Sequence, residues 1–336
     1  MPRVYRTYED LLADGRVECV VNLTNPDSHY PLTKAALEAG KHVYSEKPLA
    51  MEMDQAQELV ALAESKGLQL ASAPCTLLGE TAQTLWKALR EERIGRVRLV
   101  YAELDDGPIH LMKPERWRSD SGNPWPLKDE YEVGCTMEHA GYYITWLVAF
   151  FGPAVRVTSF STVLTEDKGT VVDRRTPDFS VACIEFESGT VARLTHSIYA
   201  PYDHGLRIIG DRGMLSTPEC WLYGSPVYLQ RRDALGLKAE KNPRKAKLLG
   251  LGPEKLPLVP GPGQALGTKK AHLMDVSRGI AEVAEAVDQR RPCRLSARFG
   301  LHVNEVTLAI QHPVEPGIPR KMTTTCGPIE PMPWAQ

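Results

Sequence analysis

The sequence carries no large excess of charge of one sign. Its 40 lysines and arginines nearly balance 42 aspartates and glutamates, which gives a formal net charge of -2. Charge therefore gives no argument for nucleic acid or an anionic membrane as a partner. Long apolar runs are also missing, because no run reaches the roughly 18 residues that a membrane span requires. We expect a cytoplasmic protein with no membrane or nucleic-acid partner.

Closely spaced cysteines are absent as well. The seven cysteines are scattered and no pair has the Cys-x-x-Cys spacing, so neither a zinc knuckle nor a disulfide framework is indicated. We expect no metal site and reduced thiols, as in cytosolic proteins generally. The seven are Cys19, Cys75, Cys135, Cys183, Cys220, Cys293 and Cys326.

A third absence concerns glycine, because no Gly-x-Gly-x-x-Gly occurs anywhere in the 336 residues. In dinucleotide-binding folds this segment joins the first strand to a helix whose N-terminus binds the pyrophosphate. Yet residues 19–24, 42–45 and 68–73 read as strands separated by helices, which predicts an incomplete doubly wound parallel sheet in an α/β fold. Strand 19–24 would then be an apolar sheet edge, which native proteins avoid. We expect a truncated or mis-assigned start, or a domain completed by a partner.

The stretch from Ala39 to Ala50 is the centre of this pattern. Gly40 ends a helix for which Asp27 or Ser28 is the expected cap, and Pro48 forces a turn after the short strand. Glu46 and Lys47 therefore lie at the carboxyl end of a strand, where open α/β sheets bind ligands. A partly buried lysine beside a carboxylate suits proton transfer. The alternative is an exposed Lys-Pro turn.

The second half of the chain has a different pattern. Residues 97–104 read as a strand, residues 105–136 as a long irregular connection, and residues 137–151 as a helix. A run of strands then predicts an α+β domain with a large, mostly antiparallel open sheet. A basic surface excursion over 234–267 and two more helices, at 271–289 and 297–311, follow. The expected strands are 155–162, 179–187, 190–198, 206–209 and 214–216.

These elements predict two domains and a tail. A partial dinucleotide-binding Rossmann-like domain covers residues 1–96, and a substrate-binding and oligomerisation domain covers residues 97–325. Residues 326–336 form a proline-containing tail.

Three segments together resemble a known family: Val20–His29, Ala35–Gly40 and Glu46-Lys47-Pro48. The chain resembles the Gfo/Idh/MocA family, the glucose–fructose oxidoreductase and inositol dehydrogenase group, from about Arg3 to beyond Gln311. It lacks the family's glycine-rich first part. The resemblance implies an NAD(P)-dependent oxidoreductase that binds NAD or NADP.

The resemblance also implies roles for the first-half residues. Lys47 would take part in proton transfer at a sugar hydroxyl, Glu46 would lie near the nicotinamide ribose, and Pro48 would fix the turn. Thr24, Asn25 and Pro26 match a loop that touches the cofactor, and His29 matches the histidine after it. A helix-capping or surface histidine remains the alternative for His29, since a lone histidine is a weak signal.

A second family motif is a glycine-rich lead followed by aspartate and, four residues on, histidine. Aligned on Gly134 and Gly152, this chain has Glu138 at the aspartate position and Tyr142 at the histidine position. The spacing of four keeps both side chains on one helical face. His139, about 100° round the helix, is another candidate substrate contact. Trp117 and Arg118 are further candidates, with packing and a surface ion pair as the alternatives.

The leading interpretation is a dehydrogenase that moves hydride between a sugar, cyclitol or related polyol and the nicotinamide, with Lys47, Glu138 and Tyr142 as catalytic residues. One alternative is a catalytically silent or truncated homologue that acts as a binding or oligomeric subunit. Another is an NAD-dependent glycosidase. The resemblance implies a homo-oligomer, a dimer or tetramer, built on the second-domain sheet. The segment that would distinguish NAD from NADP is missing, and the substrate is not identified by the sequence.

Overall fold

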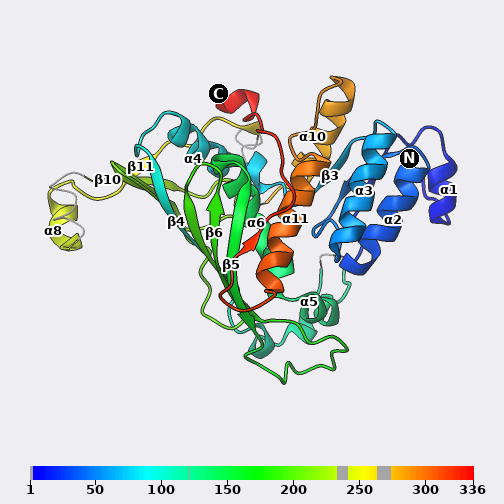
Figure 1. Ribbon diagram of the computed structural model, residues 1–336, viewed down its shortest axis with the longest axis horizontal. Coiled ribbons are helices and arrows are strands. Elements are labelled where there is room, and N and C mark those ends of the chain that lie inside the picture. Colours follow the sequence, from blue (N-terminus) through cyan, green and yellow to red (C-terminus); the bar gives the residue numbers. More distant parts are fainter. Residues whose placement is uncertain (1–2, 120, 233–240, 263–273) are drawn as a thin grey trace.

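The computed structural model describes residues 3–119, 121–232, 241–262 and 274–336, which form two sheets with helices around them (Figure 1). The smaller sheet is parallel, with strand order β1-β2-β3. It is drawn in blue in Figure 1, beside helices α2 and α3. Its elements are α1 (Tyr8–Ala13), β1 (Cys19–Asn22), α2 (Pro26–Glu38), β2 (His42–Ser45), α3 (Met53–Ser65) and β3 (Leu70–Ser72).

The start of α2 differs from the expected one. The helix begins at Pro26, and Asn25 is its N-cap residue without a capping hydrogen bond from its side chain. Asp27 and Ser28 lie inside the helix, so the expectation that one of them caps it is wrong. Proline at the first helical position explains the earlier start, because its fixed φ suits the helix and its missing N–H needs no partner.

The larger sheet has nine strands in the order β11-β10-β9-β8-β4-β7-β6-β5-β12. Every neighbouring pair is antiparallel except β4 and β7, which confirms the predicted mostly antiparallel open sheet. The bounds are β4 (Val97–Asp105), β5 (Ala154–Thr162), β6 (Phe179–Phe186), β7 (Val191–Ser197), β8 (Leu206–Gly210), β9 (Gly213–Thr217), β10 (Val227–Arg231), β11 (Glu254–Leu256) and β12 (Arg320–Lys321).

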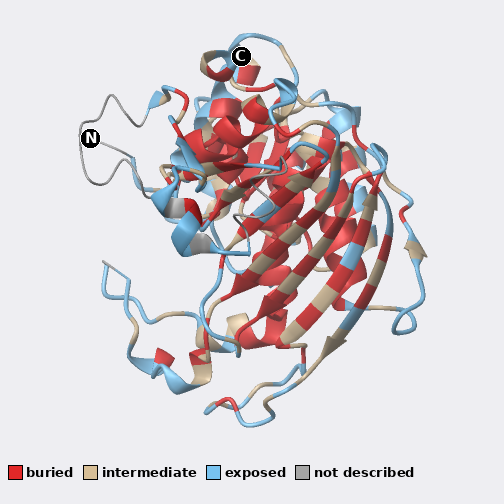
Figure 2. Cartoon of the chain, turned by 90° about the vertical axis from the view of Figure 1, so that its left-hand side faces the viewer, coloured by how far each residue is buried: buried red, intermediate tan, exposed pale blue. Residues whose placement is uncertain are grey.

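One face of this sheet is buried by helices and the other is open. Buried and more exposed residues alternate along β6 and β7, and Figure 2 shows this alternation across the curved sheet. Such alternation is typical of an antiparallel sheet with one solvated face. Helix α6 (Cys135–Phe151) is buried on almost every side between the sheet and its neighbours. Helices α4 (Glu80–Arg90) and α11 (Ala297–Gln311) complete the covering layer, whereas α10 (Ser277–Asp288) packs on β2 and β3 of the smaller sheet.

Helix α11 joins the two sheets, because it contacts α3 and β3 on one side and α6 and β5 on the other. Helix α11 packs closely on β3 at Gly300, where an added Cβ would lie 3.3 Å from the Cβ of Ser72. A larger residue would therefore require β3 or α11 to shift. The main apolar core includes Phe299 and Val306 of this helix, while Leu301 packs on the smaller core around α2 and α3.

Several short elements were not predicted. The connection over 105–136 contains α5 (Leu127–Val133) and two 3-10 turns, at Ile109–Leu111 and Pro114–Arg116. The basic segment over 234–267, expected to be a surface loop, contains α8 (Pro243–Leu248) and the edge strand β11 in its described part. Residues 233–240 and 263–273 lie outside the described part, so the expected helix at 271–289 is described only from α10 onward. None of the described helices is long and apolar enough to cross a bilayer.

Glu282 is a buried carboxylate that ties α10 to the segment before α11. Its side chain is 1% exposed and accepts hydrogen bonds from the guanidinium groups of Arg291 and Arg294 at 2.5–3.0 Å, and from the backbone N–H of Arg294 at 2.8 Å. Burial raises its pKa, but these donors outweigh burial and hold the pKa below the usual 4.5. Its contribution to stability is therefore present above pH 4.5 and is lost as the pH falls below that value.

We predict that Glu282→Gln lowers the free energy of unfolding by about 3 kcal/mol, because two arginines lose a buried anionic partner. The matched control is Glu185→Gln, which removes an exposed carboxylate from Arg156 and should cost less than about 1 kcal/mol. Denaturant titration followed by circular dichroism measures both. Equal losses in the two variants would contradict the role assigned to Glu282.

Candidate active site

The candidate active site lies where the turn after β2 meets the first turns of α6. Lys47 Nζ donates a hydrogen bond to Glu138 Oε2, and the two form an ion pair. The Lys47 side chain is 18% exposed and that of Glu138 is 8% exposed. The pair joins the parallel-sheet domain to the helix layer of the larger sheet. The expected alternative, an exposed Lys-Pro turn, is therefore not what the structure shows.

The Lys47 ammonium is held in its charged form. Burial by itself disfavours the charge, but the Glu138 carboxylate, together with Tyr142 and Glu130, outweighs it and keeps the pKa of Lys47 above its ordinary value. Lys47 therefore carries a proton at neutral pH. A buried ammonium next to the carboxyl end of a strand can donate this proton to an oxygen placed beside it.

A glycine and a glutamine position Glu138. Gly134, at the start of α6, has φ of 93° and lies so close to Gln311 that an added Cβ would be 2.8 Å from Oε1 of that residue. Gln311 accepts the N–H of Met137 at 3.0 Å and donates to the carbonyl of Val133 at 2.8 Å. The last residue of α11 thus holds the junction of α5 and α6 at Gly134 and the backbone of Met137, the residue before Glu138.

Tyr142 lies one turn further along α6 and is buried. Burial raises the pKa of its hydroxyl, so the group stays protonated and can donate a hydrogen bond. The ring centroid of Trp221 lies 5.6 Å from the Tyr142 ring and 6.0 Å from that of His139. Trp221 was not singled out from the sequence, since nothing local to residue 221 marks it as part of this site.

His29 is buried and connects the two loops at the strand ends. Its Nδ1 lies 2.7 Å from the carbonyl oxygen of Pro48, and its Nε2 lies 2.8 Å from that of Thr24. A carbonyl oxygen only accepts, so a ring nitrogen that carries a proton donates it to the carbonyl it faces. His29 is thus not a surface histidine. It holds the Thr24 loop to the turn that carries Lys47.

The loop after β1 presents Thr24 and Asn25 at the surface. Asn22 Oδ1 accepts from the hydroxyl of Thr24 at 2.7 Å, and the Asn25 amide donates to Asp129 of α5. At the next strand end, Glu46 accepts the N–H of Lys47 at 3.1 Å. These polar groups fit the nicotinamide end of a dinucleotide. The described residues include no glycine-rich turn of the kind that binds a pyrophosphate.

Three further titratable residues, His139, Asp106 and Glu130, lie close to one another, and only His139 was a candidate from the sequence. Its Nε2 lies 3.0 Å from Oδ2 of Asp106 and 3.6 Å from Oε1 of Glu130. Burial lowers the pKa of His139, although the Asp106 carboxylate opposes this. Burial, with the Glu138 carboxylate, raises the pKa of Glu130 to about 8, so this carboxyl is largely protonated at neutral pH.

Asp106 also contacts a buried histidine that the sequence did not single out. His204 Nε2 lies 2.9 Å from Asp106 Oδ1, and its Nδ1 lies 2.9 Å from Glu219 Oε1. Burial disfavours the imidazolium, but the two carboxylates outweigh it and raise the pKa of His204 to about 9. His204 is therefore a cation between two anions.

His204, Glu219 and Cys220 form the one group of metal-ligating type found among the described residues, with one atom of each within 4.8 Å of the others. The carboxylate of Glu219 already accepts from Tyr202, His204 and two backbone N–H groups. Burial raises the pKa of the Cys220 thiol well above its usual range, whereas metals bind the thiolate. The group is a hydrogen-bonded network, and we assign no metal to it.

Trp117 and Arg118 lie in the connection before α5. Trp117 is half-buried and packs against Trp125, with ring centroids 4.9 Å apart. Arg118 is exposed and donates to the carbonyl oxygens of Glu115 and Trp117 at 3.0 and 2.7 Å. Within the described residues, neither side chain makes a hydrogen bond, ion pair or ring contact with Lys47, Glu138 or Tyr142.

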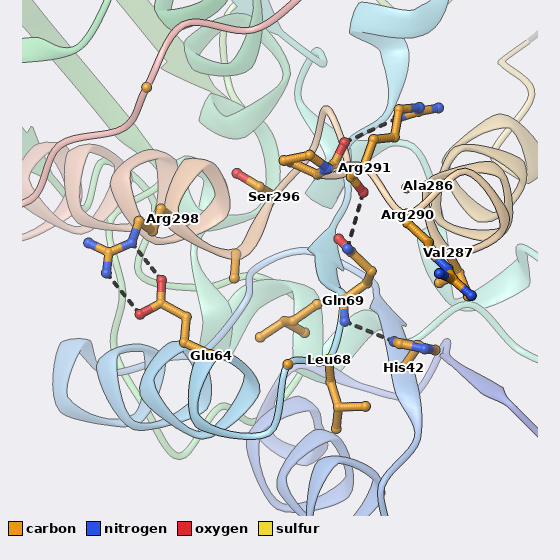
Figure 3. A pocket seen from close by; sticks show the side chains of 15 residues that line it. His42, Glu64, Leu68, Gln69, Ala286, Val287, Arg290, Arg291, Ser296 and Arg298 are labelled. Carbon is orange, nitrogen blue, oxygen red and sulfur yellow. Dashed lines mark hydrogen bonds and ion pairs between the residues drawn. The ribbon is translucent and has the colours of Figure 1, made fainter.

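A hollow of about 670 Å³ lies at the opposite ends of the parallel strands (Figure 3). His42 and Gln69, at the starts of β2 and β3, line it together with arginines from the end of α10 and the start of α11. Arg298 is paired with Glu64 across it, and Gln69 donates to the carbonyl oxygen of Arg291 at 3.2 Å. The hollow is separate from Lys47, which follows the carboxyl end of β2.

Comparison with known proteins identifies the family. A family model described as an oxidoreductase family with an NAD-binding Rossmann fold matches residues 1–73. A second model, the GFO/IDH/MocA C-terminal domain, matches residues 82–216.

Among curated proteins, mouse trans-1,2-dihydrobenzene-1,2-diol dehydrogenase is 24% identical over 221 residues, which are 66% of this chain and 61% of that protein. The uncharacterized oxidoreductase YfiI of Bacillus subtilis is 29% identical over 63% of this chain and 56% of its own length. The chain thus spans less than two thirds of either relative.

Solved structures show the same fold at low identity. Aldose-aldose oxidoreductase from Caulobacter crescentus, complexed with glycerol, has a TM-score of 0.71 and 22% identity, covering 95% of this chain and 83% of that one. WlbA dehydrogenase from Bordetella pertussis, in complex with NADH and UDP-GlcNAcA, has a TM-score of 0.67 and 18% identity, covering 96% and 84%. With both parts matched in order along the sequence, the chain belongs to the Gfo/Idh/MocA family of NAD-binding Rossmann-fold oxidoreductases.

Proposed function

We propose that the protein is an NAD(P)-dependent oxidoreductase that transfers hydride between a nicotinamide cofactor and a sugar, cyclitol or related polyol. The observation that carries the proposal is the buried Lys47–Glu138 ion pair at the carboxyl end of β2. A charged lysine in that position supplies the proton that must accompany hydride at a carbonyl oxygen. The family supports the redox chemistry, and the structures with glycerol and UDP-GlcNAcA support a hydroxylated substrate.

In the direction of carbonyl reduction, Lys47 gives a proton to the substrate oxygen, and Glu138 stabilises the lysine charge before the transfer. In oxidation the same nitrogen receives the hydroxyl proton. Tyr142 donates a hydrogen bond that orients the substrate, since its hydroxyl remains protonated. A bound nicotinamide supplies or accepts the hydride. Thr24, Asn25, Pro26, Glu46 and Pro48 would hold the nicotinamide end, and His29 would keep their two loops together.

His139 would contact the substrate from the face of α6 next to Glu138. Trp117 and Arg118 would approach it from the connection before α5. A homo-oligomeric, cytoplasmic protein is part of the same proposal. The second candidate function is a binding subunit without catalysis. It is supported by Glu138 and Tyr142, which stand where the family has aspartate and histidine.

Titration with NADH and NADPH tests cofactor binding. We predict saturable binding of at least one of them, with energy transfer from tryptophan to the reduced nicotinamide, because Trp221 lies beside Tyr142 and His139. Trp221→Phe should reduce the energy transfer most, without shifting the midpoint of the titration. The control is Trp86→Phe, since Trp86 packs against Phe150 elsewhere in the core. No saturable binding by the folded chain would contradict the proposed cofactor site.

Lys47→Ala tests the proton donor. We predict that kcat falls by about 100-fold or more, because a positioned acid or base contributes a factor of that order. The substrate is a carbonyl compound or polyol found by screening. Binding of NAD(P)H should be retained. The control is Lys34→Ala, which removes a lysine paired with Glu58 at the surface. Full turnover in Lys47→Ala would exclude the proposed mechanism, while binding without turnover in the parent protein would favour the binding subunit.

Glu138→Gln tests the electrostatics. The carboxylate keeps the pKa of Lys47 high, so its removal leaves burial as the dominant influence and lowers that pKa. We predict that the alkaline limb of the pH profile of kcat/KM for reduction moves to lower pH. Glu58→Gln, which takes the partner from surface Lys34, should leave the limb in place. If the alkaline limb of the profile stays in place in Glu138→Gln, Glu138 does not set the pKa of Lys47.

A further inference from the structure

The hollow at the amino ends of β2 and β3 has features of a ligand site, and it lies apart from the Lys47–Glu138 pair. We call it the β2–β3 hollow. Its volume of about 670 Å³ falls within the roughly 300 to 1,000 Å³ that is usual for small-molecule sites. Apolar side chains form a large part of its lining: Leu68, Leu70, Ala286, Val287, Pro292 and Ala297.

The charged residues of the β2–β3 hollow leave one arginine without a partner. Three arginines line it, and Glu64 is the one carboxylate among the described lining residues. Glu64 accepts two hydrogen bonds from Arg298, at 2.5 and 2.8 Å. Arg291 is held by the buried carboxylate of Glu282. The side chain of Arg290 makes no hydrogen bond or ion pair with any described residue, so its guanidinium is free to bind an anion.

The backbone at Arg290 favours a different residue. Arg290 follows the C-cap residue of α10 and has φ of 52°, in the left-handed region where glycine is the common residue. Its N–H donates to the carbonyl oxygen of Val287 at 3.1 Å, and the following N–H donates to that of Ala286 at 3.0 Å. These bonds close the helix and need no side chain. The arginine therefore has another role, which is either to complement the helix dipole or to bind a ligand.

His42 supplies a second donor to the hollow. Its Nδ1 accepts the N–H of Gln69 at 2.8 Å, so a neutral ring carries its proton on Nε2. Burial lowers the pKa of His42, which favours the neutral ring at pH 7. The Nε2 atom makes no hydrogen bond to a described residue. Figure 3 shows the Arg290 side chain on the same side of the hollow as His42, away from the ion pair of Arg298.

We propose that the β2–β3 hollow is a second binding site, for a phosphate monoester with an apolar body. The planar guanidinium of Arg290 binds two phosphate oxygens, and Nε2–H of His42 donates to the third. A phosphate has three strong acceptor oxygens, which suits donors that come from two separate elements better than a carboxylate does. Leu68 and Val287 contact the apolar part of the ligand. This site does not depend on the proposed function.

The β2–β3 hollow and the candidate active site lie at opposite ends of the same elements. His42 begins β2, and Lys47 follows the carboxyl end of that strand. Ala297 begins α11, whose last residue, Gln311, holds the backbone before Glu138. A phosphate monoester in the hollow therefore leaves the loops after β1 and β2 free, and both sites can be occupied at once.

Arg290→Gly tests the site in the full chain, with phenyl phosphate as the probe. Phenyl phosphate has an apolar ring and a phosphate group, but it is neither a polyol nor a dinucleotide. We expect saturable binding in isothermal titration calorimetry, weakened about tenfold or more in Arg290→Gly, because loss of a charge-assisted contact has an effect of that order. Benzoate should bind more weakly than phenyl phosphate, and benzyl alcohol, which lacks the charge, should not bind.

Glu92→Gly is the matched control. Glu92 follows the C-cap residue of α4 with φ of 51°, and its N–H donates to the carbonyl oxygen of Leu89 at 3.0 Å. Glycine suits both backbones, so denaturant titration should find both variants at least as stable as the parent. Glu92→Gly should bind phenyl phosphate as the parent does.

Two outcomes would overturn the site. One is equal affinity for phenyl phosphate in the parent and in Arg290→Gly. The other is a folded parent that does not bind the probe, and a loss of stability in Arg290→Gly would then assign Arg290 to the helix dipole alone.

A second measurement locates the probe. In protein labelled with nitrogen-15 histidine, the Nε2 resonance of His42 should shift when phenyl phosphate is added. The resonances of His302, which is bonded to the backbone N–H of Ala154 and the hydroxyl of Thr324, should stay in place. Binding of phenyl phosphate should persist in saturating NADH, whereas displacement by NADH would place the probe in the cofactor site and overturn the proposal. A chain that binds phenyl phosphate at His42 but does not bind NADH would contradict the proposed function and support this site.

Discussion

The ion pair between Lys47 and Glu138 is the contact on which the rest of the site depends. Burial of either charged side chain without its partner would destabilise the folded protein. The ion pair therefore holds the turn after β2 against the start of α6. The surrounding contacts serve this pair: Gln311 fixes the backbone before Glu138, and His29 holds the turn that carries Lys47. The loop after β1, the turn that carries Lys47 and the start of α6 are therefore held in one fixed arrangement.

Much of the inner site could be predicted from the sequence because its signals are local. Gly40, the short strand and Pro48 lie within a dozen residues, so spacing alone placed Lys47 at a strand end. Glu138 and Tyr142 share a helix face for the same reason. The parallel and antiparallel sheets followed from strand patterns, whereas the edge strands β11 and β12 were missed because strands this short carry little periodic signal. Strand β10, which lies between β9 and β11, was missed as well.

The deeper residues were not predictable in the same way. Glu130, Asp106, His204 and Glu219 are ordinary acids and a histidine scattered over loops and a seven-residue helix. Their meeting depends on the order of strands in the sheet, which brings the ends of β4 and β8 together. Sequence reasoning also misplaced the cap of α2, since Pro26 allows the helix to begin before Asp27. Local rules identify which side chains suit a task, while topology decides which of them meet.

Helix α11 has a consequence for how this scaffold can diversify. It packs against both sheets, and at Gly300 it lies against Ser72 with no room to spare. Its last residue, Gln311, sets the register of α6. The geometry of the Lys47–Glu138 pair therefore depends on side-chain volumes at positions far from the pair itself. Selection for a new substrate could adjust the reach between the two domains by changing sizes along one helix, and leave the chemical groups themselves unaltered.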